Sequence, residues 1–320
     1  MVELHSLVAK LKELANEKER TPTQREFIEL HGVSKRQVQK YKFSKLCEMA
    51  GLEPNKHAQT TAPIEPDIRP PRILFFDIET APITGYTWGT YEQSVIKILR
   101  DWFVLSYAAK FKDDDRFFYL DQRFSNPIDD DFQLLCGIHH LLSEADVCVS
   151  HNGAKFDHKK LNARFIKHGL APLNHYQVID TLKIARKHFA FTSNRLADLA
   201  KFLSCDIQKS SHAKFPGFSM WDECMKSNPE AFEEMESYNK TDVDVLIAVF
   251  NKLAPWEPTI NFQAYYQKTT CHCGTQTFFK DGFRLTKQGK FQVFRCSNCS
   301  KTFTAKENLI DKDIRKGFFK

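Results

Sequence analysis

The sequence predicts an α/β protein in which helices flank a mixed sheet, preceded by an all-helical module and followed by a small ribbon. Three observations support this organisation: helical spacing of apolar residues before residue 52, alternating strand-like and helix-like stretches in residues 72–255, and two cysteine pairs after residue 268. At 320 residues, the chain is also too long for one compact core. We therefore expect more than one domain.

Composition and charge narrow the class of protein. Hydrophobic residues make up 42% and charged residues 27% of the chain, which excludes fibrous and largely disordered classes. The longest nearly apolar run, residues 102–109, is far shorter than the roughly 20 residues of a membrane span, and no basic-then-apolar leader opens the sequence. We therefore expect an intracellular, cytoplasmic protein.

The formal net charge of +6 is unevenly distributed. Residues 268–320 hold 12 Lys and Arg against 4 Asp and Glu, whereas residues 71–267 hold 22 against 26. A basic C-terminal segment next to an acidic central region predicts that the segment binds a polyanion and that the carboxylates of the central region serve a common function. A solvated lysine-rich surface is the alternative.

The first 52 residues predict four short helices, at residues 2–19, from residue 24 onward, at 35–41 and at 44–50. Thr23 and Glu26 have the spacing of a capping box at the second helix start. A turn at residues 31–34 followed by a basic helix is typical of a helix-turn-helix module. The candidate nucleic-acid contacts on that helix are Lys35, Arg36, Gln37 and Lys40.

Residues 21–52 also resemble the small repeat that accompanies many homing endonucleases. The matching positions are Pro22-Thr23, Glu26-Phe27, the basic helix and Ala50-Gly51-Leu52. The segment Phe43-Ser44-Lys45-Leu46 replaces the usual Phe-Gly-Ser-Trp junction of that repeat. The resemblance implies DNA binding, and a helical protein-binding module is the alternative.

Residues 53–71 contain five prolines and few apolar side chains, so we expect an extended linker there. The predicted parts of the chain are then a helical module at 1–52, this linker, a central domain at 72–255 and a basic ribbon at 268–320. In the central domain, strands are predicted at 73–76, 104–111, 116–120, 147–149 and from 179, and helices at 134–142, 159–168, 195–203 and 232–249.

Carboxylates recur at three places in the central domain. Asp77 and Glu79 end the first strand and project from the same face because strand side chains alternate. Asp157 begins a helix after a turn at Asn152-Gly153, and Tyr238 and Asp242 share one helical face. Taken singly, each has an ordinary explanation: a strand entering solvent, a helix cap, or a chance spacing.

Taken in order, these patterns resemble the DEDD exonuclease superfamily, in the subtype with tyrosine in the last motif. The matching residues are Asp77 and Glu79 in Phe-Asp-Ile-Glu-Thr, Asp157 in Asn-Gly-Ala-Lys-Phe-Asp, and Tyr238 and Asp242 in Tyr-Asn-Lys-Thr-Asp. The motif sequences are most similar to those of the proofreading domain of family-B DNA polymerases and its free-standing relatives. The resemblance covers about residues 72–255 and implies an RNase H-like fold and 3′→5′ exonuclease activity. We see no polymerase region in the sequence and therefore expect a stand-alone nuclease.

The resemblance also implies a two-metal mechanism with Mg²⁺ or Mn²⁺, which prefer oxygen ligands. Asp77 would bridge both ions, Glu79 and Asp242 would help hold the ion that activates water, and Asp157 would serve the second ion. Tyr238 would orient the attacking water.

Residues near these motifs have less specific predictions. Asn152 either contacts the terminal nucleotide or forms the turn. We expect His151 and His158 to be surface or turn residues, Asp180 to start a helix and Asp244 to be solvated.

Two cysteine pairs, Cys271 with Cys273 and Cys296 with Cys299, flank a segment rich in aromatic and basic residues. This spacing predicts a structural zinc ribbon with a hairpin at 278–294 that turns near Gln288-Gly289. The first pair has one intervening residue instead of the usual two, so His272 could replace one thiol. Reduced surface thiols are the other alternative.

The C-terminal segment resembles the zinc ribbons of some transposases at Gly282-Phe283-Arg284 and Phe294-Arg295-Cys296. Its positive charge and interleaved phenylalanines favour nucleic acid as the partner, and a protein-docking ribbon is the alternative. The candidate contacts are Arg284, Lys290 and Arg295.

The whole sequence therefore predicts a stand-alone metal-dependent 3′→5′ exonuclease that acts on DNA. Two hypotheses keep the fold but change the substrate: an RNA-trimming exonuclease and a structure-specific endonuclease. A non-catalytic nucleic-acid-binding protein is the hypothesis from a different class.

Overall fold

The computed structural model describes residues 2–30, 33, 35–53, 69–91, 94–173, 176–207 and 214–318. The chain divides into two compact units, Met1–Asp67 and Ile68–Lys320. The predicted turn at 31–34, apart from Val33, and most of the predicted linker, residues 54–68, lie outside the described residues. Among the described helices, none is both long and apolar enough to cross a lipid bilayer.

The N-terminal unit contains the four predicted helices, α1 (Val2–Glu17), α2 (Gln24–Leu30), α3 (Lys35–Tyr41) and α4 (Phe43–Met49). Leu7, Leu11 and Leu14 of α1 pack with Phe27 and Leu46 in one apolar cluster. The predicted capping box is present, because the Thr23 amide donates to Glu26 Oε2 at 2.8 Å and the Glu26 amide donates to Thr23 Oγ1 at 3.2 Å. The helical spacing of the sequence is therefore confirmed.

The second unit is built on a five-stranded sheet in the order β5-β4-β1-β6-β7. Its strands are β1 (Ile73–Thr80), β4 (Val104–Phe111), β5 (Phe118–Asp121), β6 (Val147–Ser150) and β7 (Gln177–Asp180). β1 pairs antiparallel with β4 and parallel with β6, so the sheet is mixed, as predicted. β1 lies in the middle of the sheet. Its first four residues are buried, whereas Asp77, Glu79 and Thr80 near its C-terminal end are half-buried at the edge of the core.

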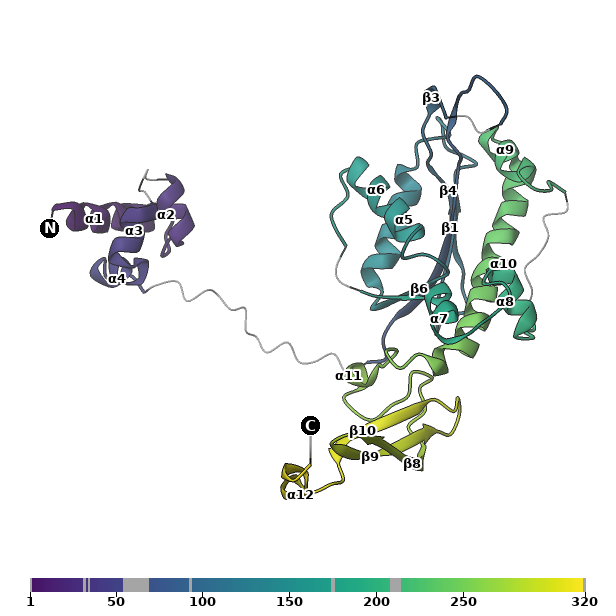
Figure 1. The fold of residues 1–320 in the computed structure, drawn as a ribbon. Helices are drawn as coiled ribbons and strands as arrows, with labels where there is room; N and C mark the ends of the chain where they lie inside the picture. Colours follow the sequence, from purple (N-terminus) through teal and green to yellow (C-terminus); the bar gives the residue numbers. More distant parts are fainter. Residues whose placement is uncertain are drawn as a thin grey trace. The chain divides into compact units, whose positions relative to one another are not determined.

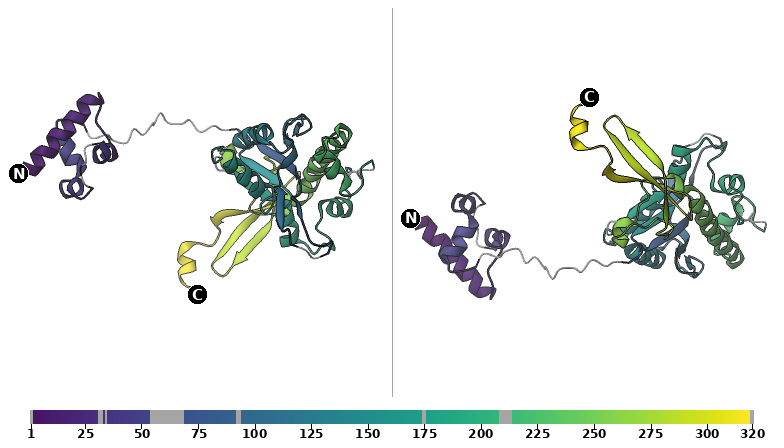
Figure 2. Two further views of the ribbon diagram at one scale, coloured as in Figure 1. Left: turned by 90° about the horizontal axis from the view of Figure 1, so that it is seen from above. Right: turned by 90° about the horizontal axis from the view of Figure 1, so that it is seen from below.

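Helices cover both faces of this sheet (Figures 1 and 2). The buried side chains of β1 alternate between the two faces. Leu74, Phe76 and Ile78 pack on the face covered by α5 (Phe132–Glu144) and α6 (Asp157–Lys167). Ile73 and Phe75 pack on the opposite face. That face is covered by α7 (Thr181–His188), α8 (Leu196–Phe202) and the long helix α10 (Pro229–Leu253).

Several elements were not predicted. They are the hairpin of β2 (Thr84–Tyr86) and β3 (Lys97–Arg100), the short helices α9 (Ser219–Met225), η1 (Ala254–Trp256), α11 (Gln263–Tyr266) and α12 (Lys312–Lys316), and the strand β10 (Thr302–Asn308). The predicted C-terminal hairpin is present as β8 (Phe278–Thr286) and β9 (Gly289–Cys296), and β10 adds a third strand beside β9.

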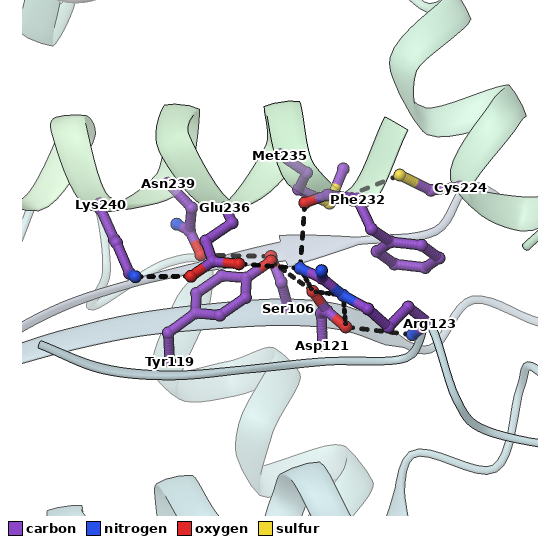
Figure 3. Close-up of polar contacts among 10 residues, drawn as sticks. All are labelled: Ser106, Tyr119, Asp121, Arg123, Cys224, Phe232, Met235, Glu236, Asn239 and Lys240. Atoms are coloured by element: carbon purple, nitrogen blue, oxygen red, sulfur yellow. Dashed lines mark hydrogen bonds and ion pairs between the residues drawn. The ribbon is translucent and has the colours of Figure 1, made fainter. Parts of the chain in front are cut away.

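A polar network fixes α10 against β5 (Figure 3). Arg123 bonds Asp121 with Nε 2.9 Å from Oδ2, and its terminal nitrogen lies 2.8 Å from Glu236 Oε2 on α10. Lys240 donates to the other oxygen of Glu236 at 2.6 Å, and the Tyr119 hydroxyl donates to Asp121 at 2.9 Å. Because these bonds span β5 and α10, they set the rotation of the helix relative to the sheet.

A buried lysine joins the C-terminal sheet to the end of α10. The Lys301 ammonium donates to the carbonyl oxygens of Glu257 at 2.5 Å, Ile260 at 2.8 Å and Ala254 at 3.4 Å. All three carbonyls lie beyond the last residue of α10, in η1 and in the segment that follows it. The three-stranded sheet is thus held to the central domain by a specific polar contact.

We expect Asp131→Ala to destabilise the central domain by about 3–5 kcal/mol. The carboxylate of Asp131 is fully buried and accepts from Arg164 Nε at 2.7 Å and from the Val104 amide at 2.9 Å. Its removal would leave the buried Arg164 guanidinium without its charge partner. Urea unfolding measures the loss. The exposed Asp115 gives the control, since Asp115→Ala should change stability by less than about 0.5 kcal/mol, and equal effects of the two substitutions would contradict this prediction.

Candidate active site

The first part of the site is the C-terminal end of β1. Because Ile73 and Phe75 face α10, the alternation of the strand directs Asp77 and Glu79 to the same side. The β4 residues paired with them are Ala108, opposite Asp77, and Ser106, opposite Glu79. Both partners are small, so the antiparallel neighbour leaves room for two carboxylates on this face.

The second part of the site is the middle of α10, which places Tyr238 and Asp242 one turn apart over this end of the sheet. Carboxylate oxygens of Asp77, Glu79 and Asp242 all lie within 4.8 Å of one another. Three carboxylates this close repel each other unless cations neutralise them. The donor set consists of oxygen alone, which suits Mg²⁺ or Mn²⁺.

Neighbouring side chains orient two of these carboxylates. The Asn239 Nδ2 amide donates to Asp77 Oδ2 at 2.8 Å, while Asn239 Oδ1 accepts from Ser106 Oγ at 3.2 Å. The Trp221 indole donates to Glu79 Oε2 at 3.2 Å. The sequence did not single out Asn239 or Trp221; the one available signal was that Asn239 lies inside the Tyr238–Asp242 pattern.

Asp157 is close to β1 but is not part of the three-carboxylate cluster. It is buried in the first turn of α6, and its Oδ1 accepts from the Ile78 amide, between Asp77 and Glu79, at 3.3 Å. Burial raises the pKa of Asp157 to about 7, and the nearby Asp180 carboxylate adds to this effect. A cation bound beside this carboxyl would restore its ionised form.

The turn between β6 and α6 has an unusual backbone. Asn152 has a φ of +64°, which asparagine tolerates better than most residues, and its amide donates to Asp180 Oδ1 at 2.9 Å. A Cβ atom on Gly153 would lie 1.9 Å from Ser150 Oγ, so only glycine fits there. Asn152 therefore forms the turn, and its contact with a terminal nucleotide stays a prediction.

A pocket of about 460 Å³ lies beside the carboxylates. Asp77, Asp242 and Asn152 contribute to its lining, and so do the exposed residues Arg186 and Arg195. Within the described part of the chain, neither arginine side chain forms an ion pair or a hydrogen bond. The pocket therefore combines oxygen ligands for cations with cationic groups available to an anion.

Two expectations about residues near these motifs need revision, and one is confirmed. His158 is buried and not on the surface: its Nδ1 lies 3.1 Å from the Tyr176 hydroxyl, and burial lowers its pKa to about 4. Asp244 is half-buried and pairs with Lys110 at 3.6 Å, so it is not simply solvated. Asp180 caps α7 as predicted, and it also accepts the Asn152 amide.

His151 is half-buried and links the β6 turn to the segment after α7. Its Nδ1 lies 2.9 Å from Thr181 Oγ1, and its Nε2 lies 3.0 Å from the Asn194 carbonyl oxygen. Since a carbonyl only accepts, Nε2 must carry a proton. His151 lies in the turn, as expected, and its ring also anchors the segment around Asn194 that lines the pocket.

The four predicted zinc ligands converge in the C-terminal sheet. All four sulfurs, from Cys271, Cys273, Cys296 and Cys299, lie within 4.8 Å of one another. The distances between Cys271 and Cys299 Sγ, 3.5 Å, and between Cys273 and Cys296 Sγ, 3.7 Å, are close to the edge of about 3.8 Å in a tetrahedral Zn–S₄ centre. His272 is adjacent but outside this cluster, so the geometry fits zinc held by four thiolates.

The predicted nucleic-acid contacts differ in their surroundings. In α3, Lys40 is exposed with its ammonium 4.9 Å from the Tyr41 ring and Gln37 is half-buried, whereas the side chains of Lys35 and Arg36 lie outside the described part of the structure. In the C-terminal sheet, Arg284 is exposed and Lys290 lies 4.1 Å from the Phe283 ring.

Arg295 differs from these residues because it has partners within its own sheet. Its Nε donates to Asp281 Oδ2 at 2.8 Å and its guanidinium donates to the Ser300 carbonyl at 3.0 Å. A nucleic-acid phosphate would have to compete with both bonds.

Residues 74–254 match the family model of the RNase_H superfamily. Among solved structures, the chain is similar to the family B DNA polymerase from the hyperthermophilic archaeon Pyrobaculum calidifontis, with 19% sequence identity and a TM-score of 0.46. That match covers 59% of this chain and 25% of the polymerase chain, so the chain spans about a quarter of the polymerase. No curated protein matches the chain significantly.

Proposed function

The chain belongs to the RNase H superfamily, whose members generally hydrolyse phosphodiester bonds, and from this premise we propose that it is a metal-dependent 3′→5′ exonuclease acting on DNA. One observation carries the proposal: β1 and α10 bring Asp77, Glu79 and Asp242 within 4.8 Å of one another beside a pocket that also contains two arginines. A site of this kind suits an anionic substrate that is cleaved with the help of divalent cations.

Asp77, Glu79 and Asp242 would hold Mg²⁺ or Mn²⁺, and Asp157 would contribute the fourth carboxylate once ionised. When bound, such ions polarise the phosphoryl oxygens and lower the pKa of a bound water. Asn239 and Trp221 keep the Asp77 and Glu79 carboxylates in place with their amide and indole hydrogen bonds. These side chains therefore preorganise the acidic group before substrate arrives.

The remaining side chains would act on the substrate and the attacking water. Tyr238 is buried on the face of α10 that also presents Asp242, and its ring packs edge-on against Trp221 with centroids 6.0 Å apart. From this fixed position its hydroxyl would orient the water by a hydrogen bond. Arg186 and Arg195, which also line the pocket, would bind substrate phosphates.

The terminal modules support a nucleic-acid partner. The basic C-terminal segment and the helical N-terminal unit would each bind the phosphate backbone, and the four thiolates would hold a structural Zn²⁺. We propose DNA as the substrate because residues 21–52 resemble a DNA-binding repeat and because the carboxylate motifs resemble those of proofreading domains.

The decisive experiment uses 5′-labelled DNA and RNA, each single-stranded and duplex, with Mg²⁺, Mn²⁺ or EDTA. We expect a ladder of progressively shortened DNA fragments that requires either metal. A single internal cut would instead indicate an endonuclease, and a ladder on RNA alone would indicate an RNA-trimming enzyme. Tight binding without any cleavage would refute the proposed catalytic role.

A further inference from the structure

The β2–β3 hairpin presents a series of apolar side chains that are largely exposed to solvent. Its exposed apolar residues are Ile83, Tyr86, Trp88, Tyr91, Val95, Ile96, Ile98 and Leu99. Trp88 and Tyr91 are 88% and 84% exposed, and the four apolar clusters of the described chain include no residue between 83 and 100. A two-stranded hairpin cannot bury such residues itself, and an exposed apolar patch of this kind marks an interaction surface.

The hairpin begins and ends beside the candidate active site. It leaves β1 shortly after Glu79 and returns to the start of β4, and β3 and α9 lie toward the same end of the domain (Figure 1). The residues at its two ends, Ile83 and Trp102, line a pocket of about 560 Å³ together with Phe218 and Trp221. Since the Trp221 indole bonds Glu79, this pocket adjoins the carboxylates.

Basic side chains accompany the aromatic rings of this surface. The Lys160 ammonium lies 3.7 Å from the centre of the Trp102 ring, and both residues line the pocket. Lys97 is exposed on β3, and Arg100 ends that strand. Aromatic rings that bind base faces, combined with cations that bind phosphates, are the usual surface for unpaired nucleic acid.

The chemistry of this surface and its position next to the carboxylates indicate which ligand binds to it. A duplex keeps its base faces stacked inside the helix, whereas a single strand can offer them to aromatic side chains. We propose that the β2–β3 hairpin, through Trp88 and Tyr91, is a stacking platform for the unpaired bases of a nucleic-acid strand whose end reaches the carboxylates. This inference rests on the proposed nuclease function and assigns the hairpin as the element that binds the unpaired strand.

The test measures binding separately from cleavage. The probe is a 5′-fluorescein oligothymidylate of about 12 nucleotides, compared with a blunt hairpin duplex. Fluorescence anisotropy without added Mg²⁺ or Mn²⁺ gives the dissociation constants for the full-length chain and for Trp88→Ala/Tyr91→Ala. We expect the double substitution to weaken single-strand binding by about 10- to 100-fold and to leave duplex binding unchanged.

Two further variants separate stacking from a structural effect. Trp88→Phe/Tyr91→Phe keeps two aromatic rings and should restore most of the single-strand affinity. Trp256→Ala removes an exposed tryptophan beyond the C-terminal end of α10 and should leave that affinity unchanged. All variants should melt within a few degrees of the parent protein, because the replaced side chains are exposed.

Unchanged single-strand affinity in the alanine double variant would overturn the inference, as would an equal loss for the duplex. Loss of self-association in sedimentation experiments, with oligonucleotide affinity intact, would assign the hairpin to a protein partner instead. The binding assay is also independent of catalysis. A parent protein that binds single strands through the hairpin but cleaves nothing would refute the nuclease function alone.

Discussion

Asp77→Ala is expected to abolish metal-dependent cleavage while the chain remains folded. Asp77 is one of the three carboxylates within 4.8 Å of one another, and its other neighbours are the Asn239 amide and the small residue Ala108. Removing one cation ligand from such a site should lower the cleavage rate on the order of 10³-fold or more. The side chain is only half-buried, so the loss of folding stability should be modest.

Initial rates on 5′-labelled single-stranded DNA with Mg²⁺ or Mn²⁺ measure this effect, and thermal unfolding confirms that the variant is folded. Asp244→Ala is a matched control. Asp244 lies on α10, two residues after Asp242, but it pairs with Lys110 and is not one of the three clustered carboxylates. Its cleavage rate should stay within a few-fold of the parent rate. Substantial activity in Asp77→Ala would remove the basis of the proposed site.

Local periodicity predicted which of the site's side chains share a face of their own strand or helix, whereas their meeting at one site was implied only by the resemblance to the DEDD exonucleases. The two-residue alternation of a strand directs Asp77 and Glu79 to one face, and the helical repeat brings Tyr238 and Asp242 together. The mixed sheet also followed from the alternation of apolar strands and helices, and the match to the RNase_H superfamily confirms that part of the prediction. The roles of these residues remain proposals.

The partners of the carboxylates were not predictable, because they depend on contacts between distant parts of the chain. Asn239 reaches Asp77 across 162 positions in the sequence, and Trp221 reaches Glu79 across 142. The buried position of His158 next to Phe76 likewise follows only once α6 packs on the sheet. No local pattern marks such residues.

The unpredicted strands have a different cause. β10 alternates exposed and half-buried residues and has almost no apolar content, and β3 is exposed along most of its length. Strand prediction relies on apolar alternation, which is limited to Phe303 and Ala305 in β10 and is absent from β3. In β10 the strand forms because Thr302, Phe303 and Thr304 pair with β9, whose course is set by the adjacent cysteines.

Cys296→Ser is expected to unfold the C-terminal sheet while the central domain remains folded. None of the four apolar clusters in the described chain includes a residue beyond Tyr266, so β8, β9 and β10 lack an apolar core of their own. Zinc binding at structural thiolate sites contributes roughly 10–16 kcal/mol, which is enough to fold a segment of this kind. We expect one zinc per chain in the parent protein and none in the variant.

Metal analysis by mass spectrometry and limited proteolysis measure this outcome, with cleavage of the variant expected within residues 268–318. Cys136→Ser is the matched control, because Cys136 is a half-buried thiol on α5 outside the cluster. Cleavage of a short single-stranded substrate should persist in Cys296→Ser, since Asp77, Glu79 and Asp242 lie on β1 and in the middle of α10. Lys301 meets only the carbonyls beyond the end of that helix. A variant that keeps its zinc and its resistance to protease would show that the sheet is held together without the four-thiolate centre. Loss of the zinc and of the protease resistance would establish that the metal folds the C-terminal sheet. Retained cleavage of the substrate in the same variant would establish that the carboxylate site works independently of that sheet.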